Sequence, residues 1–162
     1  MPTTSSLRTL ITCLVLIVAL PRAAGAEDQM EGDFDGDGFA DLVVADGNYL
    51  EKGTEVGRVR IYPGRERGVS SISVWEARGV GADSRFGSAV AVVDVNHDGY
   101  DDLLVAAGAP DAERPIELFL GSFVGLADRA AWSGVESGLG ESLGAWFEPR
   151  AEQLALLAGS KR

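Results

Sequence analysis

Residues that carry catalytic and redox chemistry are scarce in this sequence. Its 162 residues include one cysteine, Cys13, and one histidine, His97. A single histidine cannot build a histidine-based metal site, and it leaves Ser-His catalysis unsupported for Ser84, Ser88 or Ser122. Carboxylates are plentiful, but no spacing singles out a catalytic pair. The composition therefore favours a protein that is not an enzyme.

Long hydrophobic runs are also scarce, and the one that stands out lies near the N-terminus. An apolar run over residues 10–20 is followed by small residues ending at Ala26 and then by Glu27. This layout is typical of a secretory signal peptide with an A-x-A cleavage site, and the run is short for a membrane span. We predict a signal peptide over residues 1–26, cleaved after Ala26, and a secreted, periplasmic or cell-surface protein without a stable membrane span. A retained anchor is the alternative; a lipoprotein is rejected because apolar residues continue after Cys13.

The predicted mature chain lacks cysteine and carries an excess of acidic residues. Without cysteine it cannot form disulfide bonds. Cleavage removes Arg8 and Arg22 from the 14 basic residues and none of the 25 acidic ones, so the formal charge becomes 12 minus 25, or -13. Such a chain is not expected to bind nucleic acid, whereas it suits cation binding and solubility. Proline is sparse, with 6 residues against 21 glycines, and the spread of glycine indicates many turns and short strands.

Two segments of the chain have closely matching sequence patterns at an offset of 61 residues. Each has an acidic nine-residue loop, over 33–41 and 94–102, followed by a four- to five-residue apolar run and, at 47 and 108, a glycine. Further along, 58–64 matches 115–121, and 153–159 matches the run after each loop. A fixed period of this size is typical of repeat architectures such as propellers.

The expected fold is all-β, with β-propeller-type blades of four antiparallel strands. Apolar and alternating patterns predict the strands of the second repeat near 86–93, 103–107, 116–120 and Trp132. Residues 72–75 are expected to supply the last strand of the first repeat.

The first repeat lacks its opening strand in this prediction, because its loop begins only seven residues after Ala26. The chain then holds about two blades plus a partial third, which is an incomplete propeller. The predicted division is a first repeat over 27–81, a second repeat over 82–138 and a partial third repeat over 139–162.

Both acidic loops have the residue pattern of an oxygen cage for a hard cation. Carboxylate or amide oxygens stand at positions 1, 3, 5 and 9, a glycine at position 6 permits a sharp turn, and position 7 offers its backbone carbonyl. Oxygen-only ligands in a flexible cage favour Ca²⁺ over zinc, copper or Mg²⁺. We predict two Ca²⁺ sites, one formed by Asp33, Asp35, Asp37, Phe39 and Asp41 and the other by Asp94, Asn96, Asp98, Tyr100 and Asp102.

Other interpretations of the loops are weaker. A solvated acidic turn explains one such pattern, because Asp and Gly are common in turns, but two matches at the same phase of a repeat favour metal. An EF-hand is excluded because its position 12 would be Val44 and Val105 instead of glutamate. His97 stands at the variable position 4 and is expected to face solvent. Residues 148–152, in the third repeat, lack the ligand series and are predicted to bind no metal.

These motifs resemble a known repeat. Phe86-Gly87, the acidic loop and Gly108-Ala109-Pro110 resemble the FG-GAP repeat of integrin alpha-chain propellers and their bacterial relatives. The resemblance covers roughly residues 31–159. It implies a β-propeller with calcium in the loop between the first two strands of a blade. In the first repeat the Phe-Gly pair is absent and Ala45-Asp46-Gly47 replaces the usual ending.

The leading functional expectation is an exported calcium-binding repeat protein that acts as a non-enzymatic binding or adhesion module, with calcium bracing the blade loops. Its partner would be an extracellular protein or glycan bound on inter-strand loops. Two alternatives stay open: an accessory propeller of an extracellular glycan-active enzyme, and a truncated fragment of a longer propeller without independent function. Self-association to complete the propeller is a further expectation. Trp75, Trp132 and Trp146 are expected to pack in the core or between blades and not to stack on sugars.

Overall fold

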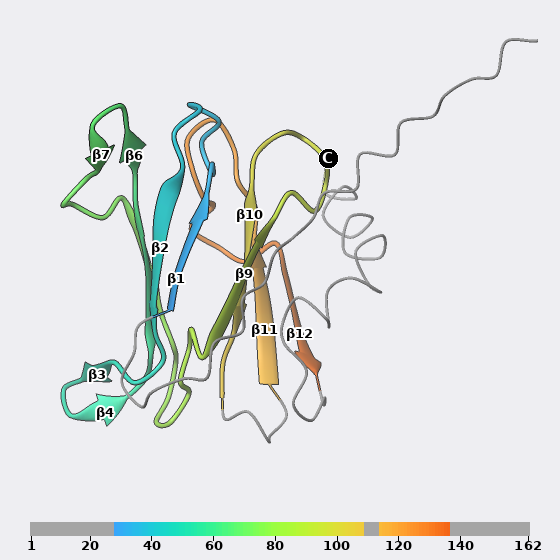
Figure 1. Ribbon diagram of the computed structural model, residues 1–162. Coiled ribbons are helices and arrows are strands. Elements are labelled where there is room, and N and C mark those ends of the chain that lie inside the picture. Colours follow the sequence, from blue (N-terminus) through green and yellow to red (C-terminus); the bar gives the residue numbers. More distant parts are fainter. Residues whose placement is uncertain (1–27, 109–113, 137–162) are drawn as a thin grey trace, which may run out of the picture.

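The computed structural model describes residues 28–108 and 114–136 (Figure 1). The predicted signal peptide (1–26) and the predicted partial third repeat (139–162) lie outside these residues. The described part contains twelve strands and no helix. It accordingly has no helix that is long and apolar enough to cross a membrane.

The first antiparallel sheet has the strand order β1-β2-β5-β8 (Figure 1). Its register places Val43 between Met30 and Ile61, and Ile61 opposite Trp75. Because residues paired across antiparallel strands lie on the same face, this row forms the apolar face of the sheet. The strands are β1 (Asp28–Gly32), β2 (Asp41–Asp46), β5 (Arg58–Tyr62) and β8 (Trp75–Arg78).

Two short hairpins project from the first sheet. One hairpin, β3 (Leu50–Glu51) with β4 (Thr54–Glu55), is formed by the chain segment that connects β2 to β5. The other hairpin, β6 (Gly64–Arg65) with β7 (Gly68–Val69), is formed by the segment that connects β5 to β8. The fourth strand of the sheet starts at Trp75, later than predicted.

The second antiparallel sheet repeats this arrangement in the order β12-β11-β10-β9. All five residues of β10 are buried, as expected for an apolar run in the interior of a sheet. The predicted all-β fold with four-stranded antiparallel blades is confirmed for these two sheets, which do not close into a ring within the described residues. The strands are β9 (Ala89–Val93), β10 (Asp102–Ala106), β11 (Arg114–Phe119) and β12 (Trp132–Glu136).

The prediction that the first repeat lacks its opening strand is wrong. All five residues of β1 pair with β2, so the first sheet is complete with four strands. The strand escaped prediction because Met30 is the one strongly apolar residue in it, whereas its pairing depends on the backbone of β2. Gly32 ends the strand where the second sheet approaches, and a Cβ there would lie 2.5 Å from Cγ1 of Val92.

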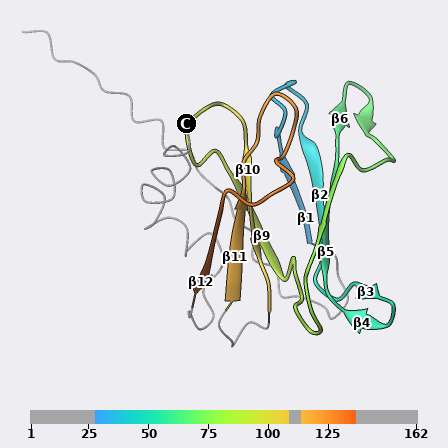
Figure 2. The same cartoon turned by 180° about the vertical axis from the view of Figure 1, so that it is seen from behind.

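The main core lies between the two sheets, which face each other in Figure 2. Val59, Ile61 and Trp75 of the first sheet join Leu103, Val105 and Phe119 of the second in one buried cluster. The rings of Trp75 and Phe119 meet edge to face, with centroids 5.0 Å apart, and Nε1 of Trp75 donates to the carbonyl oxygen of Ala127 at 3.1 Å. Trp75 therefore packs between the blades, as predicted. Trp132 packs against a second apolar cluster, and Trp146 lies outside the described residues.

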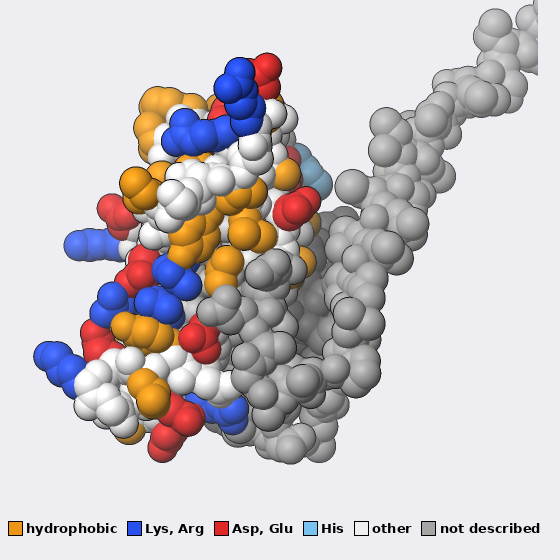
Figure 3. Space-filling view, turned by 60° about the vertical axis from the view of Figure 1, so that its left-hand side comes forward, with side chains coloured by type: hydrophobic (Ala, Val, Ile, Leu, Met, Phe, Trp, Pro, Cys, Tyr) orange, Lys and Arg blue, Asp and Glu red, His pale blue; other side chains and the backbone are white. Residues whose placement is uncertain are grey.

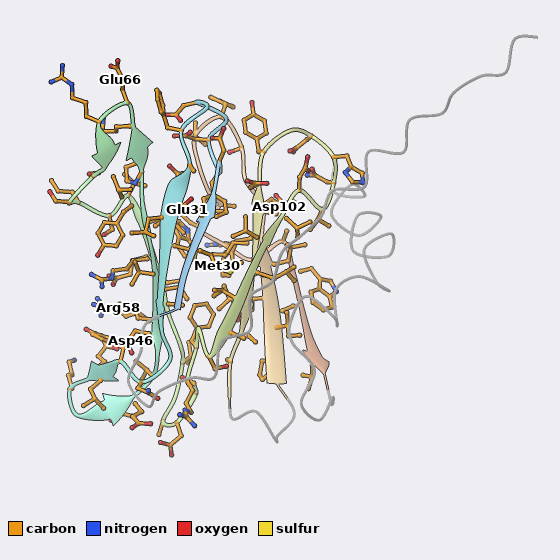
Figure 4. The ribbon with its side chains drawn as sticks, in the orientation of Figure 1. Met30, Glu31, Asp46, Arg58, Glu66 and Asp102 are labelled. Carbon is orange, nitrogen blue, oxygen red and sulfur yellow. The ribbon has the colours of Figure 1, made fainter. Side chains whose placement is uncertain are left out.

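The face of the first sheet that points away from the second sheet is charged. Arg58 of β5 pairs with Asp46 and Arg78 on its two sides. Its guanidinium lies 3.8 Å above the ring of Tyr49 and 4.0 Å from the carboxylate of Glu76. Figure 3 shows acidic and basic side chains intermixed on this side of the molecule, and Figure 4 shows Arg58 beside Asp46.

Candidate metal centre in two acidic loops

Two acidic loops connect the first and second strands of the sheets. Residues 33–40 join β1 to β2, and residues 94–101 join β9 to β10. Both loops lie at the same end of the two sheets, at the top of Figure 1 and opposite the β3–β4 hairpin. The position-9 residues, Asp41 and Asp102, are the first residues of β2 and β10. The sequence repeat is therefore also a repeat in space.

The backbone follows the same path in both loops. At position 4, Gly36 and His97 have φ values of 70° and 59°, and at position 6, Gly38 and Gly99 have φ values of 86° and 90°. Glycine adopts this left-handed conformation without strain, so the glycine at position 6 suits the sharp turn. His97 takes the same conformation with an exposed side chain, in agreement with the prediction that it faces solvent.

In the first loop, carboxylate oxygens accept hydrogen bonds from the loop's own backbone. Asp33 accepts from the N–H groups of Asp37 and Gly38, at 3.1 and 3.0 Å. Asp35 accepts from the N–H of Asp37 at 3.1 Å, and Asp37 accepts from the N–H of Phe39 at 2.8 Å. These bonds turn the side chains at positions 1, 3 and 5 inward.

The second loop repeats the same four bonds. Asp94 accepts from the N–H groups of Asp98 and Gly99, at 3.2 and 3.0 Å. Asn96 accepts from the N–H of Asp98 at 3.0 Å, and Asp98 accepts from the N–H of Tyr100 at 3.1 Å. The amide of Asn96 also donates to the carboxylate of Asp98 at 2.9 Å. The two loops thus share a hydrogen-bond pattern as well as a sequence pattern.

The oxygens at positions 1, 3 and 5 fit a hard cation. One carboxylate oxygen from each of Asp33, Asp35 and Asp37 lies within 4.8 Å of the others, a group that could hold a metal ion. Three carboxylates this close repel one another, and a cation relieves that repulsion. The second loop presents a neutral amide oxygen from Asn96 at position 3 and so carries one negative charge fewer there. Oxygen donors of both kinds are ligands that Ca²⁺ accepts.

Asp41 at position 9 differs from the other predicted ligands of the first loop because it is buried, with an exposed fraction of 3%. One oxygen accepts a hydrogen bond from the N–H of Phe34 at 3.3 Å, and the other accepts from Gly64 at 2.8 Å. The carboxylate therefore joins the start of β2 to the loop before it and to the chain after β5. Burial raises its pKa, and the two backbone hydrogen bonds oppose that shift.

Asp102 holds the matching place in the second sheet, at the start of β10 (Figure 4), and it is fully buried. Its oxygens accept from the N–H groups of Val95 and Gly121, at 2.9 and 2.8 Å. Burial and, to a smaller extent, the charges of Asp98 and Asp94 raise its pKa to about 6, against the lowering effect of the two backbone hydrogen bonds. The position-9 aspartates are thus part of the folded framework at the base of each loop.

The structure brings together the predicted ligands at positions 1, 3 and 5 and places the position-9 aspartates on buried backbone amides. The ligand role of the position-7 carbonyls, in Phe39 and Tyr100, stays a prediction. Sequence reasoning missed Asp101 at position 8, whose carboxylate accepts a hydrogen bond from the backbone of Asp33. The available signal was a break in the repeat, because position 8 of the first loop is Ala40.

Comparison with known sequences agrees with this geometry. Residues 33–105 match the profile of the FG-GAP-like repeat. The chain is 40% identical over 90 residues to phosphatidylinositol-glycan-specific phospholipase D of Bos taurus. This alignment covers 51% of the present chain and 11% of the phospholipase. It is 39% identical over 100 residues to integrin alpha-PS5 of Drosophila melanogaster and 34% identical over 100 residues to integrin alpha-7 of Rattus norvegicus. These alignments cover 59% and 60% of this chain and 10% and 8% of the two integrins.

The fold and the loops define a protein built from propeller-type blades with an acidic loop between the first two strands. Residues 33–105 are FG-GAP-like repeat sequence, so the resemblance inferred from the motifs is confirmed over this span. The chain spans about a tenth of the length of the integrin and phospholipase relatives.

Proposed function

We propose that this protein is an exported calcium-binding FG-GAP repeat protein that acts as a non-enzymatic binding or adhesion module. One observation carries the calcium assignment: two loops 61 residues apart repeat the same side-chain-to-backbone hydrogen bonds around their acidic residues. A repeated sequence repeats its turn, but both copies also turn three oxygen-bearing side chains, at positions 1, 3 and 5, toward the same loop backbone. Oxygen donors gathered in this way are the ligand set that a hard cation such as Ca²⁺ requires.

In this proposal each cation is held by the side chains at positions 1, 3 and 5, the carbonyl at position 7 and the carboxylate at position 9. Calcium neutralises the clustered carboxylates and holds the exposed part of the loop against its buried base. If it binds the native state alone, each cation would stabilise that state by about 2.7 kcal/mol at a calcium concentration of 100 Kd. The role of the metal is therefore to brace the blades.

The partner in this proposal is an extracellular protein or glycan that binds the exposed inter-strand loops. Two of the similar proteins are named as integrin alpha chains, which supports a binding role. The match to a phospholipase D supports a second candidate, an accessory propeller beside an extracellular enzyme. Export rests on the predicted signal peptide over residues 1–26.

Calorimetric titration with calcium, together with melting in calcium and in chelator, tests the metal assignment. We expect two binding events and a higher melting temperature with calcium. Asp37→Ala should remove one event because it removes a ligand oxygen, whereas Glu66→Ala, which removes a carboxylate from the β6–β7 turn (Figure 4), should leave both. No heat of binding together with an unchanged melting temperature, or equal losses in the two variants, would contradict the proposal.

A binding screen against extracellular proteins and glycans tests the partner assignment. A hit that is lost in chelator and restored by calcium is expected for a calcium-braced binding module. Hydrolysis of a substrate that continues in chelator would favour an enzyme instead.

A further inference from the structure

Asp101 joins the two acidic loops. Its Oδ2 atom accepts a hydrogen bond from the backbone N–H of Asp33 at 2.8 Å. Its own N–H donates to the carbonyl oxygen of Asp33 at 3.0 Å. Both hydrogen-bonding groups of the Asp33 backbone are therefore bound to one residue of the second loop, 68 positions further along the chain.

Asp33 is position 1 of the first loop, and its carboxylate accepts the N–H groups of Asp37 and Gly38 that close this loop. Asp101 thus fixes the main chain of the residue whose side chain shapes the first site. Gly32 allows this approach, because a Cβ at Gly32 would lie 3.2 Å from Oδ2 of Asp101. The larger Val93 stands at the matching place in the second repeat.

Asp101 is also a part of the second loop. It stands between Tyr100 and Asp102, which are positions 7 and 9 of the second predicted site. A change in the path of the second loop therefore moves the groups that hold Asp33. The first loop has Ala40 at the matching position, and an alanine side chain cannot form a hydrogen bond. The side chain in this connection therefore comes from the second loop, and the first loop contributes backbone groups.

Two further contacts connect the loops. The carbonyl oxygen of Phe34 accepts from the N–H of Ser122 at 3.1 Å, and the preceding residue, Gly121, donates to Asp102 at 2.8 Å. In addition, the ring of Tyr100 packs on Gly36, where a Cβ would lie 2.7 Å from the ring. Residues at positions 7 and 9 of the second loop thus reach the first loop by separate routes.

We propose that Asp101 is a positioning residue that couples calcium binding at the two loops, so that filling either site raises the affinity of the other. The inference rests on the proposed calcium function. Ordering the second loop fixes Asp101 and with it the backbone of Asp33, so part of the ordering of the first site is complete before its own cation arrives. Because coupling of this kind is reciprocal, the first site must raise the affinity of the second by the same factor.

Calorimetric calcium titrations of the whole chain test the coupling. Asp98→Ala isolates the first site, and Asp37→Ala isolates the second. In the wild type, the product of the two association constants should exceed the product of the two isolated constants by about tenfold, within the range typical of coupled sites. With Asp101→Ala added to all three proteins, this factor should fall, because the side-chain bond to the N–H of Asp33 is lost. Asp101→Asn, which keeps an oxygen acceptor for the N–H of Asp33, should keep most of the factor and replaces the alanine variant if that variant does not fold.

The outcomes separate the two proposals. If the wild type binds no calcium, the proposed function is wrong and the coupling is wrong with it. If the wild-type product equals that of the isolated sites, calcium binding stands but the coupling is wrong. If the tenfold factor persists with Asp101→Ala, the loops are coupled by another route and the assignment to Asp101 is wrong.

Discussion

Phe34, at position 2 of the first loop, anchors that loop in the core. Its side chain is 1% exposed and belongs to the cluster between the two sheets. Its N–H donates to Asp41, and its carbonyl oxygen accepts from Ser122. Phe34→Ala keeps both backbone bonds and removes only the buried ring. Loss of a buried phenylalanine side chain costs about 3–5 kcal/mol, because the transfer free energy of the ring is lost and a cavity remains.

The free energy of unfolding, measured by urea denaturation at fixed calcium and pH, tests this value. The matched control is Phe123→Ala, because Phe123 is 78% exposed and its removal should change stability by no more than about 0.5 kcal/mol. The slope of the unfolding free energy with urea should stay constant, so that the shift in midpoint reports stability. A loss below about 1 kcal/mol for Phe34→Ala would refute the anchoring role, since that is less than the cost of a buried ring.

Two further predictions use single substitutions on the second sheet and beside it. Burial raises the pKa of the Glu117 carboxyl group on β11, so this group holds its proton more tightly in the folded protein than in the unfolded chain. The free energy of unfolding therefore falls as the pH rises from the pKa of the unfolded state through the pKa of the folded state. Glu117→Gln should therefore raise the melting temperature at pH 7 and raise it less at pH 4; equal shifts at both values would contradict this. At Gly121, a Cβ would lie 2.2 Å from the carbonyl oxygen of Asp101 and 3.0 Å from that of Phe34, both backbone atoms. Gly121→Ala should therefore cost about 1–3 kcal/mol in urea denaturation and weaken calcium binding in calorimetry, and an unchanged variant would show that the contact is not restrictive.

The features that sequence predicts well are local ones. The strand after the second loop, expected over 103–107, is β10 at Asp102–Ala106, because a continuous apolar run records burial on both faces of the strand. The loops are equally local, since nine consecutive residues contain both the candidate ligands and the glycine of the turn. Two copies of the same pattern made the blade arrangement predictable before any contact was known.

The features that sequence missed depend on distant partners. The strand β1 has one strongly apolar residue, Met30, and exists because its backbone pairs with β2. Similarly, Asp101 looks like one more acidic residue of its loop, and its bond to Asp33 follows from how the two sheets pack. The start of the strand predicted over 72–75 is wrong for the opposite reason. Ile72 is apolar, but its side chain is 74% exposed and it precedes the strand, which begins at Trp75. Periodicity records the environment of a strand face and not the identity of its neighbour.

The two faces of the first sheet bear on self-association. One face packs on the second sheet, and the other carries Arg58, Glu76 and Arg78 in ion pairs with one another or with Glu51. The terminal repeats of stacked arrays need a polar outer face of this kind to remain soluble. An apolar blade placed on it would have to desolvate these charges, which is costly even for paired groups. Self-association through this face is therefore disfavoured.

Each acidic loop has an exposed half and a buried half, and the charges connect them. The oxygens at positions 1, 3 and 5 bond to exposed amides within the loop, whereas Asp102 bonds to amides at the base of the blade. Asp94 and Asp98 are among the groups that raise the pKa of Asp102. A cation that neutralised them would lower that pKa and favour the ionised carboxylate on which the two buried bonds depend most. This electrostatic link explains how a metal in an exposed loop could strengthen the buried framework beneath it.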